Sequence, residues 1–175
     1  MRLNLRNCLQ FCLCLLSLVS AGVHATPETE EAELKAAFVY NFTLFTNWPQ
    51  QHEKKLYICL LGEISYASEL NLYDGRSVNG ATLKIAQVKS LSEAQSCQVL
   101  IPEIKDQAYI NRIKKELNGL PTLIIAESGN YSPDSAHIMM IKNNNRIEFD
   151  VNQTEAKISN LSFSFKLLKL AHKVY

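Results

Sequence analysis

Few residues of this chain have the types and spacing that an active site requires. Glu148 and Asp150 stand two positions apart, and paired carboxylates can act as a general acid and a general base. The same alternation is also typical of the polar face of an antiparallel edge strand. His52 and His137 have no companion serine or cysteine in a recognisable context. We therefore expect no catalytic residues and no enzyme activity.

A second set of polar residues could bind a small molecule. Glu127 and Ser128 directly follow an apolar, strand-like segment at residues 122–126. Ligands in open α/β sheets sit beyond the carboxyl ends of strands, so a cleft is expected there. Arg76 could complete it as an anion contact or could be a solvated turn charge. His172 could be a ligand or could stabilise a helix C-terminus.

The first 25 residues have the pattern of a secretory signal peptide. Arg2 and Arg6 provide a positive start, residues 9–19 an apolar centre, and residues 23–25 a small-x-small cleavage signal. The apolar centre is shorter than the roughly 20 residues that span a bilayer. We expect cleavage after Ala25, export to the periplasm, and a mature domain of residues 26–175 without a direct membrane anchor.

The expected mature chain is nearly neutral. Loss of Arg2 and Arg6 leaves 16 of the 18 basic residues against 17 acidic ones. Because nucleic-acid binding needs a positive surface and the chain has no basic tract, we expect no nucleic-acid partner. The length is that of one domain with a single core.

Only two of the five cysteines, Cys59 and Cys97, lie outside the expected signal peptide. Both occupy apolar, strand-like positions in a chain that is expected to be exported. Such a pair predicts one disulfide, with two buried free thiols as the alternative. Two cysteines without nearby histidines do not complete a tetrahedral metal site, so no metal and no cofactor is expected.

An aromatic helix at residues 34–48 is the strongest structural element that the sequence predicts. Pro49 ends it, because the residue before a proline is disfavoured in helical conformation. The helix is either a core helix packed on a sheet or one that docks a partner protein, with Tyr40, Leu44 and Trp48 as the expected contacts. Its apolar residues at helical spacing are Leu34, Ala37, Phe38, Phe42, Phe45 and Trp48.

The remaining apolar patterns predict strands and further helices. Strands are expected at residues 56–61, 83–88, 97–101 and 122–126, and a hairpin at residues 137–141 and 146–151. Helices are expected at residues 65–73, 107–117 and 152–157, and a last one at 158–171 with Leu161, Phe165 and Leu168 in the core. This order predicts an α/β fold: a single compact domain with a mixed, largely parallel sheet, flanking helices and a late antiparallel hairpin.

Three patterns, in order, resemble the YfiR family of small periplasmic proteins. They are residues 35–49, the turn at residues 75–80, and the late segments 138–141, 146–152, 158–159 and 167–171. Cys59 and Cys97 also resemble the bridged pair of that family. Members with a second disulfide place cysteines near the late strands, whereas residues 135–150 contain none here. Redox sensing through a second bridge is therefore not implied.

The resemblance implies a non-enzymatic regulator of cyclic-di-GMP signalling. The best-described role in the family is to bind the periplasmic sensor domain of an inner-membrane diguanylate cyclase and hold the enzyme inactive. Such a regulator is a diguanylate cyclase inhibitor, and its release from the enzyme lets cyclic-di-GMP synthesis and biofilm formation rise. The alternative is a periplasmic small-ligand-binding or sensing module that acts with another membrane sensor, such as a histidine kinase. The sequence leaves a homodimer open.

Overall fold

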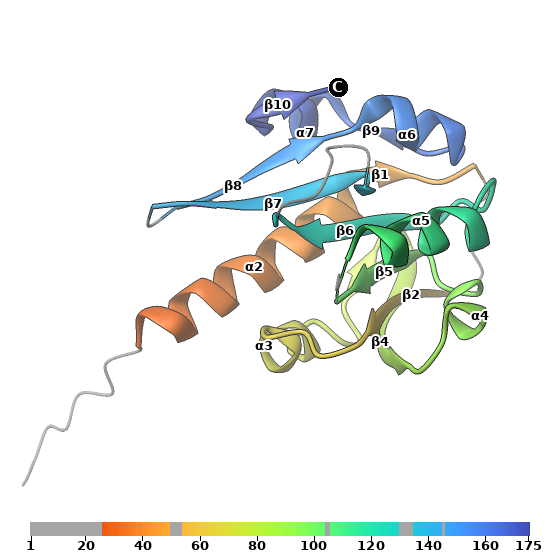
Figure 1. Cartoon of the computed structure of the whole chain (residues 1–175). Helices are drawn as coiled ribbons and strands as arrows, with labels where there is room; N and C mark the ends of the chain where they lie inside the picture. The colour runs from red at the N-terminus through yellow and green to blue at the C-terminus, as the bar shows by residue number, and fades with distance from the viewer. Residues whose placement is uncertain (1–25, 50–53, 104–105, 130–134, 145) are drawn as a thin grey trace, which may run out of the picture.

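The computed structural model describes residues 26–49, 54–103, 106–129, 135–144 and 146–175 (Figure 1). The expected signal peptide and His52 lie outside the described residues. The described residues begin at Thr26, which precedes the first helix, and end at Tyr175.

One eight-stranded sheet forms the centre of the domain, in the order β10-β8-β7-β6-β5-β2-β4-β3. The five central strands are parallel, and β7 and β8 form an antiparallel hairpin. The predicted α/β class, with a largely parallel sheet and a late hairpin, is thus confirmed. The strands are β2 (Lys55–Leu61), β3 (Ser77–Val78), β4 (Ala81–Val88), β5 (Val99–Pro102), β6 (Leu123–Glu127), β7 (Ile138–Asn143), β8 (Arg146–Val151) and β10 (Lys173–Val174).

Helices cover both faces of this sheet (Figure 1). Because successive side chains of a strand point to opposite faces, Ile58 of β2 packs with one layer and Cys59 with the other. The first layer contains α2 (Pro27–Leu44), α3 (Ala67–Asn71), α6 (Gln153–Ile158) and α7 (Phe165–Leu170). The second contains α4 (Leu91–Ala94) and α5 (Gln107–Glu116).

The predicted disulfide between Cys59 and Cys97 is present in the structure. It connects β2 with the residues before β5, with the two Cα atoms 6.0 Å apart. Both cysteines belong to the core between the sheet and the α4–α5 layer. The bridge therefore lies inside the fold and joins β2 to the segment that leads into the neighbouring strand β5.

α2 differs from the predicted aromatic helix in its end and in its buried face. Thr26 caps its start, and it ends at Leu44, so the prediction that it continues to Trp48 was wrong. Thr46 and Asn47 instead form β1 (Thr46–Asn47), which pairs antiparallel with β9 (Ser162–Phe163). Leu34, predicted to be buried, is 43% exposed, whereas its neighbour Lys35 is only 8% exposed. Two carboxylate partners, described below, make the burial of that charge possible.

The helix predicted at residues 158–171 begins later than expected, because α7 covers only Phe165–Leu170 of that range. α6 ends at Ile158, and Asn160 then adopts a φ of 55°, a left-handed conformation that a right-handed helix cannot continue. β9 and α7 follow the break. As a result Phe165, predicted to lie in the core, is 79% exposed, while Leu161 and Leu167 are buried.

Candidate functional site

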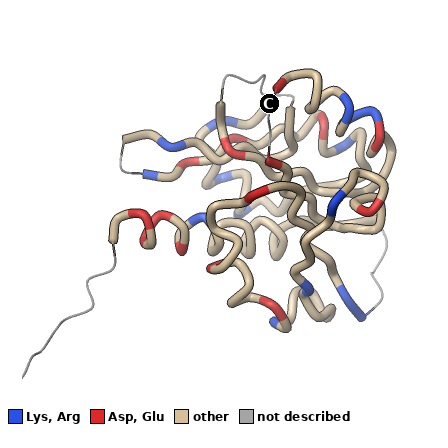
Figure 2. The backbone as a smooth tube through the Cα atoms, turned by 60° about the horizontal axis from the view of Figure 1, so that its bottom comes forward, with Lys and Arg blue, Asp and Glu red and all other residues tan. Residues whose placement is uncertain are grey.

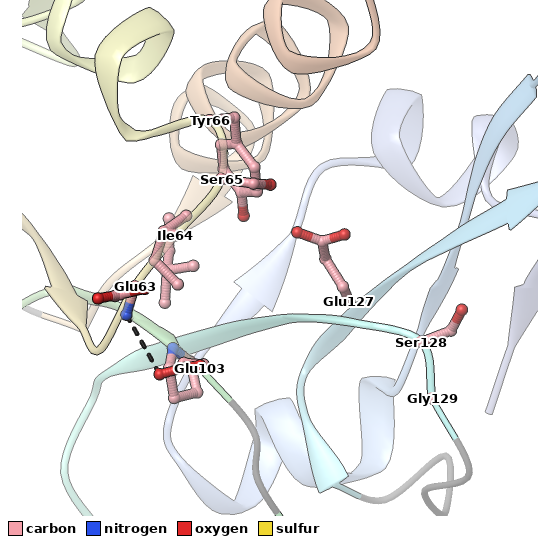
Figure 3. Close-up of a pocket in the computed structure, with 10 residues that line it drawn as sticks. Glu63, Ile64, Ser65, Tyr66, Glu103, Glu127, Ser128 and Gly129 are labelled. Carbon is pink, nitrogen blue, oxygen red and sulfur yellow. Dashed lines mark hydrogen bonds between the residues drawn. The ribbon is translucent and has the colours of Figure 1, made fainter. Parts of the chain in front are cut away.

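A pocket of about 300 Å³ lies at the carboxyl ends of β2, β5 and β6 (Figure 3). This is the edge at which open α/β sheets bind ligands. The structure places Glu127 and Ser128 in its lining, at the position where the sequence predicted a cleft. Arg76 and His172, the other two residues of that predicted cleft, are not among the described residues that line it.

Glu103 lines this pocket, and its position requires a glycine at residue 62. Gly62 follows β2 with a φ of 98°, and a Cβ atom added there would lie 2.6 Å from the Cβ atom of Glu103. Only glycine combines this conformation with so close a neighbour. The Glu103 carboxylate accepts a hydrogen bond from the backbone N–H of Glu63 at 3.2 Å (Figure 3). The backbone of the β2–α3 loop thus holds one carboxylate at the pocket.

Tyr66 is one of the residues that line the pocket. Its side chain is fully buried, and its hydroxyl group has no hydrogen-bonding partner among the described residues. Burial, and then the charge of Glu127, raises the pKa of Tyr66, so the hydroxyl group stays protonated. The ammonium group of Lys35 lies 5.8 Å from the centre of the ring. The sequence contained no signal for this unpaired group, because Tyr66 fits an apolar helical pattern.

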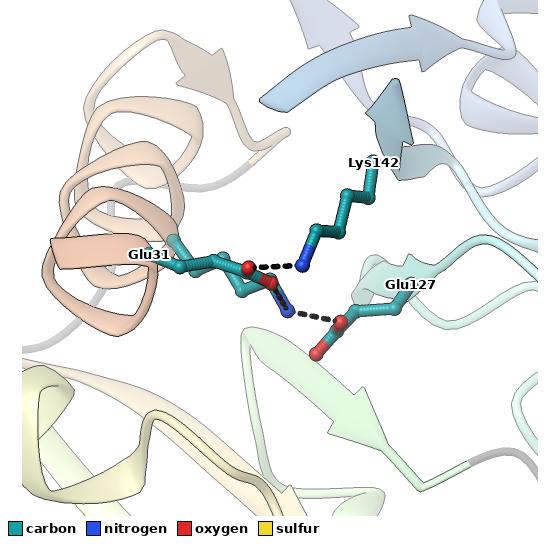
Figure 4. A network of polar contacts seen from close by, with 4 residues as sticks. Glu31, Glu127 and Lys142 are labelled. Carbon is teal, nitrogen blue, oxygen red and sulfur yellow. Dashed lines mark hydrogen bonds and ion pairs between the residues drawn. The ribbon is translucent and has the colours of Figure 1, made fainter. Parts of the chain in front are cut away.

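Lys35 connects the pocket to α2 through a network of ion pairs (Figure 4). Its Nζ atom lies 2.5 Å from Oε2 of Glu127 and 2.9 Å from Oε1 of Glu31. Glu31 also pairs with Lys142 of β7 at 2.6 Å. Burial lowers the pKa of Lys35, but the hydrogen bonds to Glu127 and Glu31 outweigh it, and the pKa is raised. The hydrogen bonds from Lys142 and Lys35 lower the pKa of Glu31.

Arg76 lies beside the predicted partner-binding residue Tyr40. Its guanidinium carbon is 4.6 Å from the ring centre of Tyr73 and 5.8 Å from that of Tyr40. The two rings stack with their centres 4.9 Å apart, and the Tyr40 hydroxyl group donates to the carbonyl of Ser77 at 3.4 Å. We name Tyr40, Tyr73 and Arg76 the arginine–tyrosine stack. Leu44 and Trp48, the other predicted contacts, are half-buried against the core of the first layer.

The carboxylates of Glu148 and Asp150 bind different structural partners. Asp150 pairs with the Nδ1 atom of His172 at 3.0 Å and accepts a hydrogen bond from the Tyr175 hydroxyl group at 3.2 Å. Glu148 accepts a hydrogen bond from the side chain of Asn143 at 3.4 Å. His172 thus helps to attach the end of the chain to β8. Both carboxylates therefore belong to the polar face of β8, although β8 is not the edge strand that the sequence suggested, because β10 pairs beside it.

In the structure the side chain of Ser159 contacts that of His137, a serine–histidine contact that the sequence analysis did not predict. The Nε2 atom of His137 lies 3.0 Å from the Ser159 hydroxyl oxygen. However, Nδ1 accepts the backbone N–H of Ile124 at 2.9 Å, so in the neutral ring the proton is on Nε2, which donates to Ser159. A general base would need its lone pair on Nε2. This pair therefore has the wrong tautomer to activate a nucleophile.

Burial, and then the charge of Lys114, lowers the pKa of His137 to about 4. The imidazole is accordingly neutral at neutral pH. Within the described residues, no group of three or more histidine, cysteine, aspartate or glutamate side chains is arranged to hold a metal ion. In the same part of the chain, no helix has the length and apolar character needed to cross a bilayer.

Comparisons with known proteins identify a family and a fold. The family model described as YfiR/HmsC-like matches residues 32–172. No curated protein matches the chain. Similar solved structures include an ABC domain from Streptococcus pneumonia in complex with L-Trp, with 9% identity and a TM-score of 0.53. A conserved domain protein from Vibrio cholerae O1 biovar El Tor has 12% identity and a TM-score of 0.52.

Both structural alignments cover 82% of this chain and 60% of the other chain. The chain thus spans about 60% of the length of these two proteins. At these identities the likeness shows a shared fold alone.

Proposed function

The chain belongs to the YfiR/HmsC-like family, and from this membership we propose that it is an exported regulator of a membrane signalling protein. After removal of residues 1–25 as a signal peptide, it binds the periplasmic sensor domain of an inner-membrane protein. That partner is a diguanylate cyclase, and binding lowers its cyclic-di-GMP output. The observation that carries the proposal is the family match over residues 32–172.

The local chemistry of the chain supports a regulatory rather than a catalytic role. The family is a regulatory one, and the one serine–histidine contact described above has a tautomer that cannot remove a proton from Ser159. The Glu148 and Asp150 carboxylates bind neighbouring side chains of their own fold. Regulation needs none of these groups to react, since it requires only a surface that a partner recognises.

We place the contact with the partner at the arginine–tyrosine stack and the adjoining C-terminal half of α2. Arg76 is exposed, and its planar group lies over two half-buried tyrosine rings. Arginine and tyrosine are enriched among the residues that contribute most to protein–protein binding. A guanidinium group held in place by two rings also loses little freedom when it pairs with a carboxylate.

Repression then follows from a preference for one conformation of the sensor domain. A regulator shifts a conformational equilibrium only by the difference between its affinities for the two states. A preference of about 5.5 kcal/mol would move the sensor from 1:99 to 99:1 in favour of its inactive form.

The proposal is tested by deleting the gene and measuring cellular cyclic-di-GMP. We expect the concentration to rise, and the rise to disappear when the membrane cyclase is also deleted. A plasmid copy of the wild-type gene should restore repression, whereas Arg76→Glu should not. Arg112→Glu is the matched control, because Arg112 lies 5.2 Å from the ring centre of Tyr109 in the other helical layer. Unchanged cyclic-di-GMP and no membrane partner in periplasmic crosslinking would contradict the proposal.

A second candidate function is that of a small-ligand sensor acting with another membrane protein. The pocket beside Glu127 favours it, and the pneumococcal domain of similar fold was solved with L-Trp. A thermal-shift screen against amino acids, nucleotides and cell-wall fragments distinguishes the two functions. A tightly bound small ligand together with the absence of any protein partner would favour the sensor.

A further inference from the structure

We propose that the pocket at the carboxyl ends of β2, β5 and β6 binds a small organic amine. In this proposal the pocket glutamates hold the ammonium group, and the neutral hydroxyl group of Tyr66 makes a further hydrogen bond. The proposal goes beyond the regulatory function and is independent of the partner, because it concerns a site that the isolated protein contains.

The charge of the pocket selects a cation. Three of its described lining residues are Glu63, Glu103 and Glu127, and none of the described ones is basic. The nearby Lys35 already binds two carboxylates, those of Glu31 and Glu127. A concave site lined by one sign of charge concentrates ions of the opposite sign.

Glu127 retains an oxygen with which to bind such a cation. Its Oε2 atom accepts the hydrogen bond from Lys35, and its Oε1 atom has no hydrogen-bonding partner among the described residues. The Glu127 side chain is 42% exposed, so a ligand in the pocket can reach it. Figure 3 shows Tyr66, Glu103 and Glu127 arranged around the same hollow.

The unpaired hydroxyl group of Tyr66 is the second, independent indication of a ligand. Folded proteins pair almost all of their buried polar groups, and an unpaired one is costly. Tyr66 is fully buried, yet it lines the pocket and its hydroxyl group has no partner in the described part of the chain. A neutral phenol can both donate and accept, so it can bind an N–H group or a hydroxyl group of a ligand.

An organic ammonium ion fits this arrangement better than a metal ion. Calcium and magnesium need several oxygen ligands that converge on one point, and the described residues form no such group. An ammonium group needs only separate acceptors for its N–H groups. Ile64, Ile101 and Pro102 supply apolar contacts for an attached carbon chain. Carboxylate-bearing ligands, amino acids included, would bring a negative charge close to the glutamates.

Three four-carbon compounds test this selectivity on the purified exported protein: putrescine with two ammonium groups, 4-aminobutyrate with one ammonium and one carboxylate, and succinate with two carboxylates. We expect isothermal titration at low salt to show saturable binding of putrescine, binding of 4-aminobutyrate weaker by about tenfold or more, and none of succinate. Equal binding of all three, or no saturable binding of putrescine, would overturn the proposal. Calcium chloride is the inorganic control. If it changed the NMR chemical shifts of the protein in the same way as putrescine, the site would be one for inorganic cations, and the proposal would also be overturned.

Variants then locate the binding. Glu103→Gln and Tyr66→Phe should each weaken putrescine binding by about fivefold or more, because each removes one group that contacts the ligand. Glu116→Gln is the matched control, since it makes the same charge change on an exposed residue of α5, which is not part of the pocket. Tyr66→Phe keeps the buried ring, so a folded variant is expected. Wild-type affinity in both pocket variants would refute the site.

Discussion

Lys35 and Glu127 form an ion pair between α2 and the end of β6, with Nζ 2.5 Å from Oε2. The two residues are 92 positions apart in the sequence, and the pair attaches the long N-terminal helix to the edge of the sheet where the pocket opens. Figure 2 shows that the start of α2 is acidic, and Glu31 in this region shares both Lys35 and Lys142. The helix, the pocket and the hairpin are thus joined by one set of charges.

Glu127→Gln should lower the free energy of unfolding by about 2 kcal/mol. The variant removes one charged partner of the buried Lys35, while Glu31 remains as the other. The exposure of Glu127 reduces the effect below that of a fully buried pair. Urea unfolding measures it, with Glu116→Gln as a control of equal charge change. A midpoint equal to that of the wild type would show that the pair contributes nothing.

His137 should make the protein less stable in mild acid. Its pKa in the folded protein is about 4, below the ordinary value of 6.5, so the unfolded chain takes up a proton first as the pH falls. The contribution to stability is complete above pH 6.5, is lost as the pH falls towards 4, and does not change further below that. Its total is about 3 kcal/mol.

Urea unfolding at a series of pH values between 7.5 and 4 measures this slope, and His137→Gln should remove it. The effect of Glu31, whose pKa is lowered from 4.5, comes at more acidic pH, because its stabilising charge is lost only as the pH falls through that lowered value. The two groups therefore act in separable windows. Equal slopes for wild type and variant above pH 4.5 would show that His137 is not the group responsible.

Tyr66→Phe should raise the free energy of unfolding by about 1 kcal/mol, since it removes a buried hydroxyl group without a partner and keeps the ring. Differential scanning calorimetry without ligand measures the change. The same variant is expected to bind putrescine more weakly, so stability and binding should move in opposite directions. Destabilisation would instead mean that the hydroxyl group is satisfied within the fold.

Gly62→Ala should destabilise the protein more than Gly75→Ala. Both glycines have a positive φ, 98° and 81°, so both substitutions introduce the same kind of backbone strain, about 1–2 kcal/mol. Only at Gly62 would the new Cβ atom also meet Glu103, whereas the space around Gly75 is open. The difference between the losses of unfolding free energy in the two variants therefore measures how closely Glu103 packs against Gly62. Equal losses would rule out such close packing.

Reduction of the disulfide between Cys59 and Cys97 should lower the free energy of unfolding by about 4 kcal/mol in the loop-entropy model, since the bridge closes a loop with a sequence separation of 38. Urea unfolding with and without a reductant measures this. Mass spectrometry after alkylation of the exported protein should detect no free thiol. Two alkylated cysteines in that protein would contradict the bridge.

The sequence by itself determined the fold class and its main elements. The apolar runs at residues 58–61 of β2 and 123–126 of β6 are buried on both faces of the sheet, so their strand identity is encoded locally in their side chains. Asp106 and the periodic apolar residues after it likewise indicate a helix, and the structure shows α5 with Asp106 as its cap. These features depend on neighbours in the sequence, which is why reasoning from the sequence could find them.

Only the tertiary structure decided which polar residues meet. Lys35 is buried because Glu127 lies beside it, Arg76 stacks on Tyr40 and Tyr73, and Ser159 contacts His137. Apart from the contact of Arg76 with Tyr73, which lies within one turn, each of these contacts joins distant parts of the chain. Its energy exists only after the fold has placed those parts side by side. Local periodicity cannot carry that information, because the burial of a charge or a hydroxyl group depends on the partner that the fold provides.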